Sequence, residues 1–324
     1  MVGVTETVLV TGAAGFIGRW VVTELLDRGY VVRGLDDLSN GSRANVAAFA
    51  DDPAFSLHVG DVTDEVTVDE FFEEGKQEAT ACIHLAAEID VHESLESPSE
   101  HFRTNVVGTR NVLEICRRTD TRLTLVGTCM VYNVASGTGG IDETHPVEPA
   151  SPYAGTKLAG EELAMSYHHG YDLPVTVLRP FNTYGPYQKT GMAGGVVSIF
   201  VDSDRRGETL QIIGDGTQTR DLMYATDCAL FVVDGAVSEA AVGEVINAGT
   251  GRDISINDLA ELVATPGTGI EHVEHHHPQS EIERLRCDPG KAMELLGWQP
   301  QITLEEGVER LRRWLDTRQT EREV

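Results

Sequence analysis

The sequence predicts an α/β protein built on a doubly wound parallel sheet, with a smaller domain towards the C-terminus. Three observations predict this class. A short apolar strand, 8–10, runs directly into a glycine-rich turn and a helical stretch. Strand-like and helical stretches then alternate as far as residue 179, the pattern of parallel strands joined by crossover helices. The 324 residues, 41% of them hydrophobic, suffice to bury a large core.

The turn after the first strand suits a phosphate ligand. Gly12 and Gly15 let the backbone approach a pyrophosphate at a helix N-terminus, where amide donors and the helix dipole favour anions. Gly18 permits close packing of helix on strand. The predicted cofactor-binding residues of this turn are Gly12, Gly15, Phe16, Ile17 and Gly18.

The second strand, 30–35, ends in an acidic pair that begins with Asp36. A carboxylate at this point accepts hydrogen bonds from the adenosine ribose hydroxyls and repels a 2′-phosphate. NAD is therefore the predicted cofactor, in preference to NADP. Arg19 and Arg33 are alternative partners for such a phosphate.

Two more strands, 56–62 and 81–85, complete the predicted cofactor site. The first ends in an acid and an apolar residue that can flank the adenine ring. The second opens into small residues that leave room for the backbone of the cofactor, and a long helix follows at 98–118. The further predicted cofactor contacts are Asp37, Asn40, Gly41, Asp61, Val62, Leu85, Ala86, Ala87 and Asn105.

The strand at 123–126 delivers Thr128 to its C-terminal end, where ligands of open parallel sheets collect. A helix is predicted soon afterwards, with Ser151 as its N-cap and Pro152 in its first turn.

This helix carries Tyr153 and Lys157 one turn apart on one face. An ammonium group beside a phenol favours the phenolate, so that the tyrosine acts as a base nearer to neutral pH. Such a pair suits removal of a proton from an alcohol while a hydride leaves the carbon. The predicted catalytic residues are Thr128, Tyr153 and Lys157.

The glycine motif, the hydroxyl residue at 128 and the Tyr-x-x-x-Lys pair resemble those of the extended short-chain dehydrogenases/reductases. The segments 178–186, 214–221 and 247–249 are similar to those of the NAD-dependent nucleotide-sugar epimerases and dehydratases within that superfamily. The resemblance runs from about residue 7 to residue 315 in the same order. It implies a Rossmann domain, bound NAD, a nucleotide-sugar substrate and a homodimer with helices near 98–118 and 153–169 at its interface.

The resemblance also implies roles for single residues. Tyr153 is the expected base, and Lys157 is its partner and bonds the nicotinamide ribose, so both residues are also expected to contact the cofactor. Thr128 is the residue that holds the sugar hydroxyl. Asn182 and Arg220 match residues that contact the substrate diphosphate. The implied substrate contacts are Glu88, Thr128, Tyr153, Asn182, Val196, Arg220 and Glu281. Glu281 stands for an acid that binds the nucleotide ribose, although the arginine that usually accompanies it is missing.

The expected domains are an NAD-binding domain at 1–179, joined by part of 223–250, and a mainly substrate-binding domain at 180–324. Within the returning part, 223–233 is predicted to supply a strand and a helix to the first domain. Three consecutive histidines at 275–277 cannot all face one ion, so no metal site is predicted.

The residues directly after Thr128 bear on which reaction the site performs. In the family, 4,6-dehydratases commonly have an acidic residue there, and decarboxylases usually keep a glutamate, whereas Cys129 and Met130 occupy these positions here. An epimerase needs no such acid. Epimerisation at C4 of a nucleotide hexose, with UDP favoured, is therefore the expected activity. A dehydratase, a decarboxylase, a keto-sugar reductase and a non-catalytic NAD-binding regulator stay open.

Charge and cysteine content limit the partners and the setting. A formal net charge of −27 argues against nucleic acid and anionic membranes as partners. So acidic a chain suits a salt-rich cytoplasm, where salt screens self-repulsion. The five cysteines are scattered along the chain and show no Cys-x-x-Cys spacing, as is typical of a reduced cytoplasmic protein. No stretch is long and apolar enough to predict a membrane span.

Overall fold

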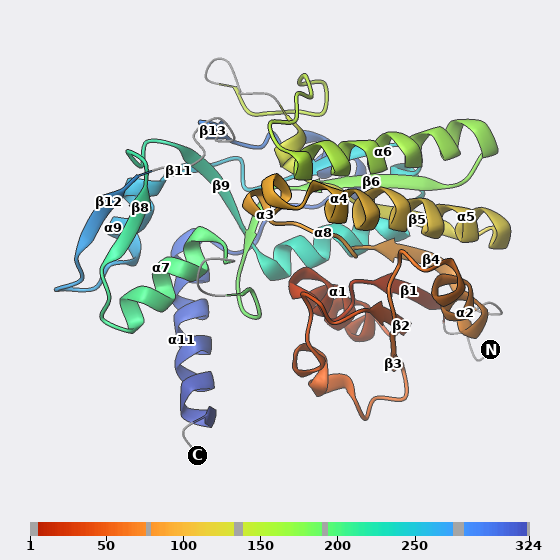
Figure 1. Cartoon of the computed structure of the whole chain (residues 1–324), viewed down its shortest axis with the longest axis horizontal. Coiled ribbons are helices and arrows are strands. Elements are labelled where there is room, and N and C mark those ends of the chain that lie inside the picture. The colour runs from red at the N-terminus through yellow and green to blue at the C-terminus, as the bar shows by residue number, and fades with distance from the viewer. Residues whose placement is uncertain (1–5, 76–78, 133–138, 190–193, 275–281, 323–324) are drawn as a thin grey trace.

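The computed structural model describes residues 6–75, 79–132, 139–189, 194–274 and 282–322. Among these residues, seven parallel strands form the main sheet in the order β3-β2-β1-β4-β5-β6-β10, which confirms the predicted doubly wound fold (Figure 1). The strands are β1 Thr7–Thr11, β2 Val31–Asp36, β3 Phe55–Val59, β4 Ala79–His84, β5 Arg122–Val126, β6 Val175–Pro180 and β10 Val245–Ala248.

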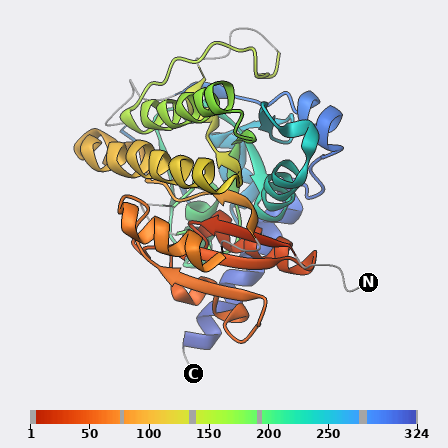
Figure 2. The ribbon, with the colours of Figure 1, turned by 90° about the vertical axis from the view of Figure 1, so that its right-hand side faces the viewer.

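Helices cover both faces of this sheet. The helices α1 and α8 pack together over one face, and α10 adds Ala292 to the same core. On the other face α2, α5 and α6 lie side by side (Figure 2). The helices of this unit are α1 Phe16–Asp27, α2 Glu65–Gly75, α3 Val91–Glu96, α4 Pro98–Phe102, α5 Thr109–Thr119, α6 Pro152–Tyr171, α8 Ala225–Val237 and α10 Gly290–Leu296, with the short turns η1 Arg43–Asn45, η2 Ala47–Phe49, η4 Cys129–Val131 and η5 Glu239–Ala241.

The register of the sheet brings the ends of its central strands level. Thr11, the last residue of β1, pairs with Leu35 on one side and with His84 on the other. His84 in turn pairs with Leu125 near the end of β5. From β1 the strand order runs through β2 to β3 on one side and through β4 to β10 on the other. Ligands of open parallel sheets bind where the strand order reverses in this way.

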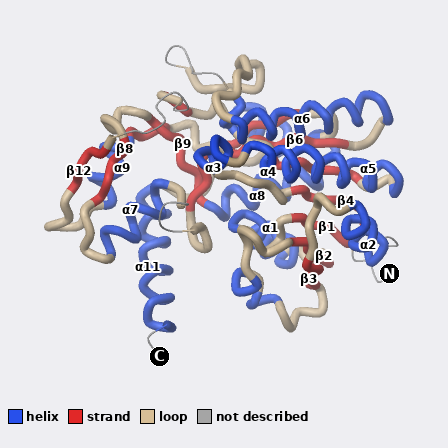
Figure 3. The backbone as a smooth tube through the Cα atoms, in the orientation of Figure 1, coloured by secondary structure: helices blue, strands red, loops and turns tan. Residues whose placement is uncertain are grey.

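A second unit lies beside the carboxyl edge of the main sheet (Figure 3). Its central strand β9 pairs with β7, β11 and β13, and β8 pairs with β12. Its helices pack around a separate core that includes Phe200, Leu259 and Leu311. The elements are β7 Asn182–Tyr184, β8 Leu210–Ile213, β9 Thr219–Tyr224, β11 Asp253–Ser255, β12 Ile270–Val273, β13 Arg284–Leu285, α7 Val196–Arg205, α9 Ile256–Val263 and α11 Leu304–Arg322.

Two predicted elements need correction. Residues 223–233 supply the first unit with a helix, α8, but not with a strand, because Met223 belongs to β9 and pairs with Thr183 of β7 in the smaller sheet. The strand that joins the main sheet is β10, which pairs with β6. The domain limits at 1–179 and 180–324 stay a prediction.

The expected helix at 98–118 is interrupted by a π-helical segment, η3, at Arg103–Gly108 between α4 and α5. Such segments are frequent at functional sites, and this one contains Asn105. None of the helices within the described ranges is both long and apolar enough to cross a membrane.

Candidate active site

The glycine turn after β1 is built for close backbone contact. Gly12 has a positive φ of 72°, and a Cβ there would lie 2.7 Å from the amide nitrogen of Ala86. A Cβ on Gly18 would overlap the carbonyl oxygen of Gly12, so the N-terminus of α1 rests directly on the turn. Gly15 is the N-cap residue, and Phe16 and Ile17 are the first helical residues. The turn therefore has the compact shape that the cofactor prediction requires.

Asp36 ends β2 and braces this turn. Its two carboxylate oxygens accept hydrogen bonds from the amides of Ala14 and Leu38, each at 2.9 Å. Burial raises the pKa of Asp36, and these backbone hydrogen bonds oppose the rise. A Cβ on Gly41 would lie 2.7 Å from the Asp36 carboxylate, so the 36–41 loop folds tightly over the turn. Each oxygen keeps acceptor capacity for a ribose hydroxyl.

Arg19 is not placed as a phosphate partner. Its guanidinium packs 4.5 Å from the ring centre of Trp20 and 4.3 Å from that of Tyr187, and it donates to the Tyr187 hydroxyl at 3.2 Å. It joins α1 to the loop after β7 instead. Arg33, on β2, donates to Ser56 of β3 at 3.4 Å.

The other predicted cofactor residues line the ends of neighbouring strands. Asp37 is exposed and accepts from the backbone amide of Ser39. Asp61 accepts from the amide and the hydroxyl of Thr63, while Val62 is buried.

Leu85, Ala86 and Ala87 are half-buried and follow β4. Hydrogen bonds from the amides of Leu85 and Ala86 to Thr11 hold this segment against β1.

Asn105 lies buried in η3 and connects three segments. Its side-chain oxygen accepts from the amide of Glu88, and its side-chain nitrogen donates to the Glu88 carbonyl, each at 2.9 Å. The same nitrogen donates to the Thr156 hydroxyl of α6 at 3.0 Å. Asn105 thus fixes the segment after β4 relative to the helix that carries Tyr153.

The carboxylate of Glu88 is half-buried and accepts from Asn40 at 2.9 Å. Burial raises the pKa of Glu88. Asn40 also accepts from Lys189 of the second unit at 2.6 Å. The predicted cofactor residue Asn40 and the predicted substrate residue Glu88 are thus direct neighbours.

The three predicted catalytic residues come together. Ser151 caps α6 by accepting from the amide of Ala154 at 3.2 Å, as predicted. The Tyr153 hydroxyl hydrogen-bonds Thr128, which sits just beyond β5. Lys157 lies one turn further along α6 and donates to the Val126 carbonyl at 2.7 Å.

The expected effect of Lys157 on Tyr153 is absent from the structure. Burial raises the pKa of Tyr153 to about 12, against the predicted fall. Burial also lowers the pKa of Lys157 to about 8. The predicted spacing is correct, but the cost of placing either charge in a dry site exceeds the benefit that one takes from the other.

A buried polar cluster beneath these residues is absent from the sequence prediction. Glu161, one turn beyond Lys157, forms an ion pair with Arg179 of β6 at 2.7 Å. Both side chains are almost fully buried. The signal available in the sequence is the Lys-x-x-x-Glu spacing, which places the two residues on one face of the helix.

Two predicted diphosphate residues lie on neighbouring strands of the smaller sheet. Asn182, on β7, donates to the carbonyl of Asp221 at 3.3 Å. Arg220, on β9, donates to the carbonyls of Thr219 and Ile282, each at 2.8 Å. Burial raises the pKa of the Cys129 thiol to about 12, and the positive charge of Arg220 opposes this rise. Arg220 therefore lies near Cys129. The structure thus brings Arg220 to the catalytic turn.

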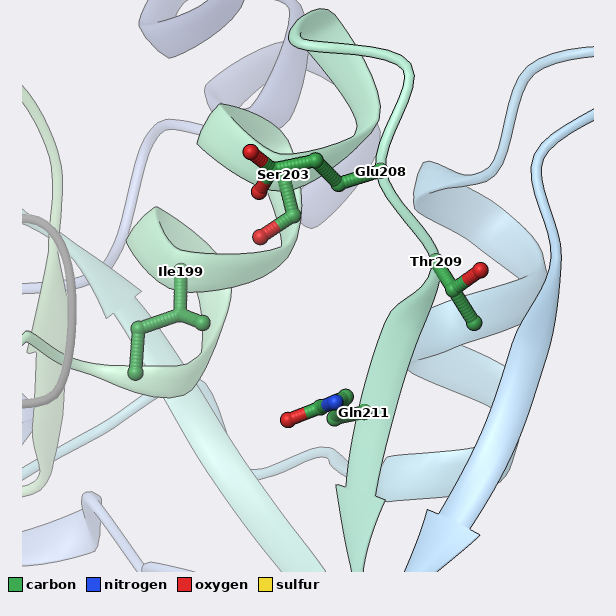
Figure 4. Close-up of a pocket in the computed structure, with 5 residues that line it drawn as sticks. All are labelled: Ile199, Ser203, Glu208, Thr209 and Gln211. Carbon is green, nitrogen blue, oxygen red and sulfur yellow. The ribbon is translucent and has the colours of Figure 1, made fainter.

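Val196 begins α7, and a pocket of about 330 Å³ lies further along that helix, between α7 and β8 (Figure 4). The lining residues are Ile199, Ser203, Glu208, Thr209 and Gln211. No predicted substrate residue lines it. Glu281 and the histidines at 275–277 lie outside the described residues. Within the described part of the chain, no group of three or more His, Cys, Asp or Glu side chains could hold a metal ion.

Comparisons with known proteins agree with this architecture. Residues 9–311 match the family described as GDP-mannose 4,6 dehydratase. The chain is 38% identical over 313 residues to a UDP-glucose 4-epimerase of Mycolicibacterium smegmatis, covering 93% of this chain and 95% of that protein.

Solved structures extend the likeness. Pal from Bacillus thuringiensis is 47% identical with a TM-score of 0.93, and the match covers 96% of this chain and 99% of Pal. A dTDP-glucose 4,6-dehydratase from Bacillus anthracis, solved in complex with NAD, is 27% identical with a TM-score of 0.87, over 98% of each chain. The chain therefore belongs to the extended short-chain dehydrogenase/reductase family of nucleotide-sugar epimerases and dehydratases.

Proposed function

We propose that this protein is an NAD-dependent nucleotide-sugar 4-epimerase that acts on a UDP-hexose through a transient 4-keto sugar. The observation that carries the choice of reaction is the environment of Thr128. The next two residues are Cys129 and Met130, and burial raises the pKa of the Cys129 thiol to about 12. A thiol so weakly acidic is a poor proton donor for the loss of water.

The residues after β1 and β2 fit NAD. A Cβ at Gly12 or Gly18 would collide with other backbone atoms. Because neither residue has a side chain, the backbone of the turn packs closely on the N-terminus of α1, where a pyrophosphate can accept hydrogen bonds from the amides. Asp36 presents a carboxylate at the end of β2, where a ribose hydroxyl can donate to it. Bound NAD would supply the acceptor and the donor of the hydride.

The side chains of the site would then divide the work. Tyr153, as the tyrosinate, takes the proton from the C4 hydroxyl during oxidation and becomes the phenol, which returns the same proton during reduction. Thr128, hydrogen-bonded to Tyr153, orients the same hydroxyl. Lys157, when charged, stabilises the tyrosinate that must be present before oxidation, because a neutral phenol cannot accept the proton. Product and substrate are isomers, since the keto sugar can rotate before the hydride returns.

Arg220 and Asn182 would hold the diphosphate. The support for Arg220 is its position beside the catalytic turn and the planar fork that its guanidinium offers to phosphate oxygens. The support for UDP is the 38% identity to a protein named UDP-glucose 4-epimerase. Val196, at the start of α7, is a further proposed substrate contact.

Dehydration is the alternative that one observation favours. Glu88 is half-buried, and burial raises its pKa, as suits a general acid. Its carboxylate accepts a hydrogen bond from Asn40, however, which is a proposed contact of the cofactor and not of the sugar.

Mass spectrometry of the product decides the reaction. The purified enzyme is incubated in high salt with a panel of sugar nucleotides. An unchanged mass with inverted C4 by NMR, and no net NADH, is expected. A product lighter by one water means dehydration, and loss of carbon dioxide from a glucuronate means decarboxylation. Consumption of external reduced cofactor means a keto-sugar reductase, and no turnover of any substrate favours a regulator.

NAD is expected to bind more tightly than NADP, because Asp36 repels a 2′-phosphate. The change Asp36→Asn should narrow that difference, since it removes the charge and keeps one acceptor. Asp36→Ala should also weaken the binding of NAD, because the backbone amides of Ala14 and Leu38 lose their hydrogen-bond acceptor and the turn is no longer held in place. Fluorescence titration of both cofactors measures the effect. Equal affinities in the unmodified protein would contradict the role of Asp36.

The protein is also proposed to be a homodimer that uses the helical layer of α4, η3, α5 and α6. Phe102 is 51% exposed on this layer. Val107, Leu158 and Met165 are half-buried, although Leu158 and Met165 also pack within the chain.

Light scattering in molar salt is expected to give twice the 35.2 kDa of one chain. Salt is needed because a formal charge of −27 per chain opposes association when unscreened. A mass of 35.2 kDa alone would exclude the dimer.

A further inference from the structure

Lys157 lies one helical turn before Glu161, a buried carboxylate that has no role in the proposed reaction. Its ammonium group donates to the Val126 carbonyl at the end of β5. Glu161 follows one turn later on the same face of α6 and is only 2% exposed. Burial lowers the pKa of Lys157, and the Glu161 carboxylate opposes that fall because it favours the charged form of the lysine.

Glu161 is held in place by a chain of hydrogen bonds. Two nitrogens of Arg179 donate to the same Glu161 oxygen, at 2.9 and 2.7 Å. A third Arg179 nitrogen donates to the Tyr132 hydroxyl at 2.8 Å, and that hydroxyl donates to Asn247 at 2.7 Å. The four side chains are at most 5% exposed. These hydrogen bonds fix the position of the Glu161 carboxylate through one of its oxygens, Oε2, whereas the buried Oε1 has no hydrogen-bond partner among the residues that the structure describes.

The second Glu161 oxygen points at the turn that carries Thr128. A Cβ on Gly127 would overlap this oxygen, so only glycine leaves room for the carboxylate there. The Glu161 side chain therefore reaches from α6 to the turn after β5 that carries Thr128.

Titratable or charged groups around Lys157 come from four elements: Tyr153 and Glu161 on α6, His84 on β4, Arg179 on β6 and Cys129 on η4.

Burial lowers the pKa of His84 to about 3 and raises that of Cys129 to about 12, so both are neutral near pH 7. Tyr153 is neutral for the same reason. Burial raises the pKa of Glu161 as well, but the Arg179 guanidinium opposes that rise. Its ion pair with Arg179 at 2.7 Å makes Glu161 the group within this set that supplies negative charge.

We propose that Glu161 is a positioning residue for the oxidation step: its carboxylate, anchored by Arg179, keeps Lys157 charged and in place beside Tyr153. The inference rests on the proposed proton transfer at Tyr153, but not on which product forms. When the Glu161 charge is removed, Lys157 is expected to lose its own charge at a lower pH.

Direct titration of Lys157 tests this. The chain has four lysines, at 76, 157, 189 and 291, so NMR of ¹³C-lysine-labelled, NAD-free protein can resolve each one. The Lys157 signal is identified by its loss in Lys157→Met. Its midpoint is expected near pH 8 in the unmodified protein. In Glu161→Gln it should fall by about one pH unit, because an anionic neighbour is removed.

The pH dependence of kcat/KM should follow the titration. The alkaline limb is expected to move down with the Lys157 midpoint in Glu161→Gln and to return towards its original position in Glu161→Asp, which restores the charge. Tyr132→Phe is the matched control, because it breaks the network beyond Arg179 and leaves the Glu161–Arg179 pair intact. It should lower stability without moving the limb.

Glu161→Gln leaves the Arg179 charge buried without its partner, which destabilises the fold. The double change Glu161→Gln with Arg179→Gln removes both charges, and the Lys157 midpoint should still fall. An unchanged midpoint in the folded single or double variant would overturn the proposal. A product lighter by water would instead overturn the epimerase assignment and leave this inference standing, because oxidation comes first in both reactions.

Discussion

Replacement of Tyr153 by Phe is expected to lower turnover by about 10²–10⁴-fold, the usual contribution of a positioned acid–base group. Phenylalanine keeps the ring that fills this buried position and removes the oxygen that hydrogen-bonds Thr128. NAD and the sugar nucleotide should therefore still bind. Steady-state rates, with cofactor and substrate affinities measured separately, check the result.

The same helix offers a matched control. Tyr167 is also buried and lies on α6, near the end of the helix opposite to Tyr153. Its hydroxyl donates a hydrogen bond to Glu114. Tyr167→Phe should lower stability slightly and leave turnover unchanged. Thr128→Val should reduce turnover less than Tyr153→Phe, if water or another hydroxyl takes the place of the lost oxygen. Retention of more than a tenth of the original rate in Tyr153→Phe would exclude Tyr153 as the base.

Local signals in the sequence predict the elements on which the site stands. A serine and a proline before Tyr153 predict the start of α6, and the Ser151 side chain does cap that helix. Glycines spaced by three after an apolar strand predict the turn at Gly12, which has the positive φ that glycine permits. These features depend on residues within a few positions of each other.

Non-local features cannot be predicted in the same way. Met223 begins the segment predicted to give the main sheet a strand, but it pairs with Thr183 of β7, forty residues earlier in the chain. Arg19 lies on α1 and is a reasonable phosphate partner by sequence alone, yet Tyr187, far away in the sequence, takes it. The choice between such partners is made by tertiary packing.

The pKa values of Tyr153 and Lys157 depend on how deeply both side chains are buried, and the spacing of the two residues in the sequence does not predict that burial. The four-residue interval between Tyr153 and Lys157 correctly predicts one helical face. It does not predict that both are 7% exposed, so that burial, and not their mutual attraction, dominates both pKa values. The ion pair of Glu161 and Arg179 beneath them joins a helix to a strand 18 residues later. It becomes visible only when both elements are placed.

Substitution of Gly18 by alanine is expected to damage both folding and cofactor binding. The added Cβ would overlap the carbonyl oxygen of Gly12, which is backbone and cannot rotate away. α1 must therefore shift off the turn, and overpacking of this kind costs about 1–3 kcal/mol of stability. The shift also moves the helix amides away from the proposed pyrophosphate position, so NAD affinity should fall at least tenfold, or about 1.4 kcal/mol.

Gly170→Ala provides the comparison, because this glycine is exposed on α6 and a Cβ there meets no atom within 4 Å. Alanine is the better helix former, so this variant should be as stable as the original protein or more so, by up to about 1 kcal/mol. Urea unfolding and NAD titration of both variants, in the same salt, separate the two effects. If Gly18→Ala binds NAD as tightly as Gly170→Ala does, the cofactor does not depend on the contact between α1 and the glycine turn, and the pyrophosphate assignment must be abandoned.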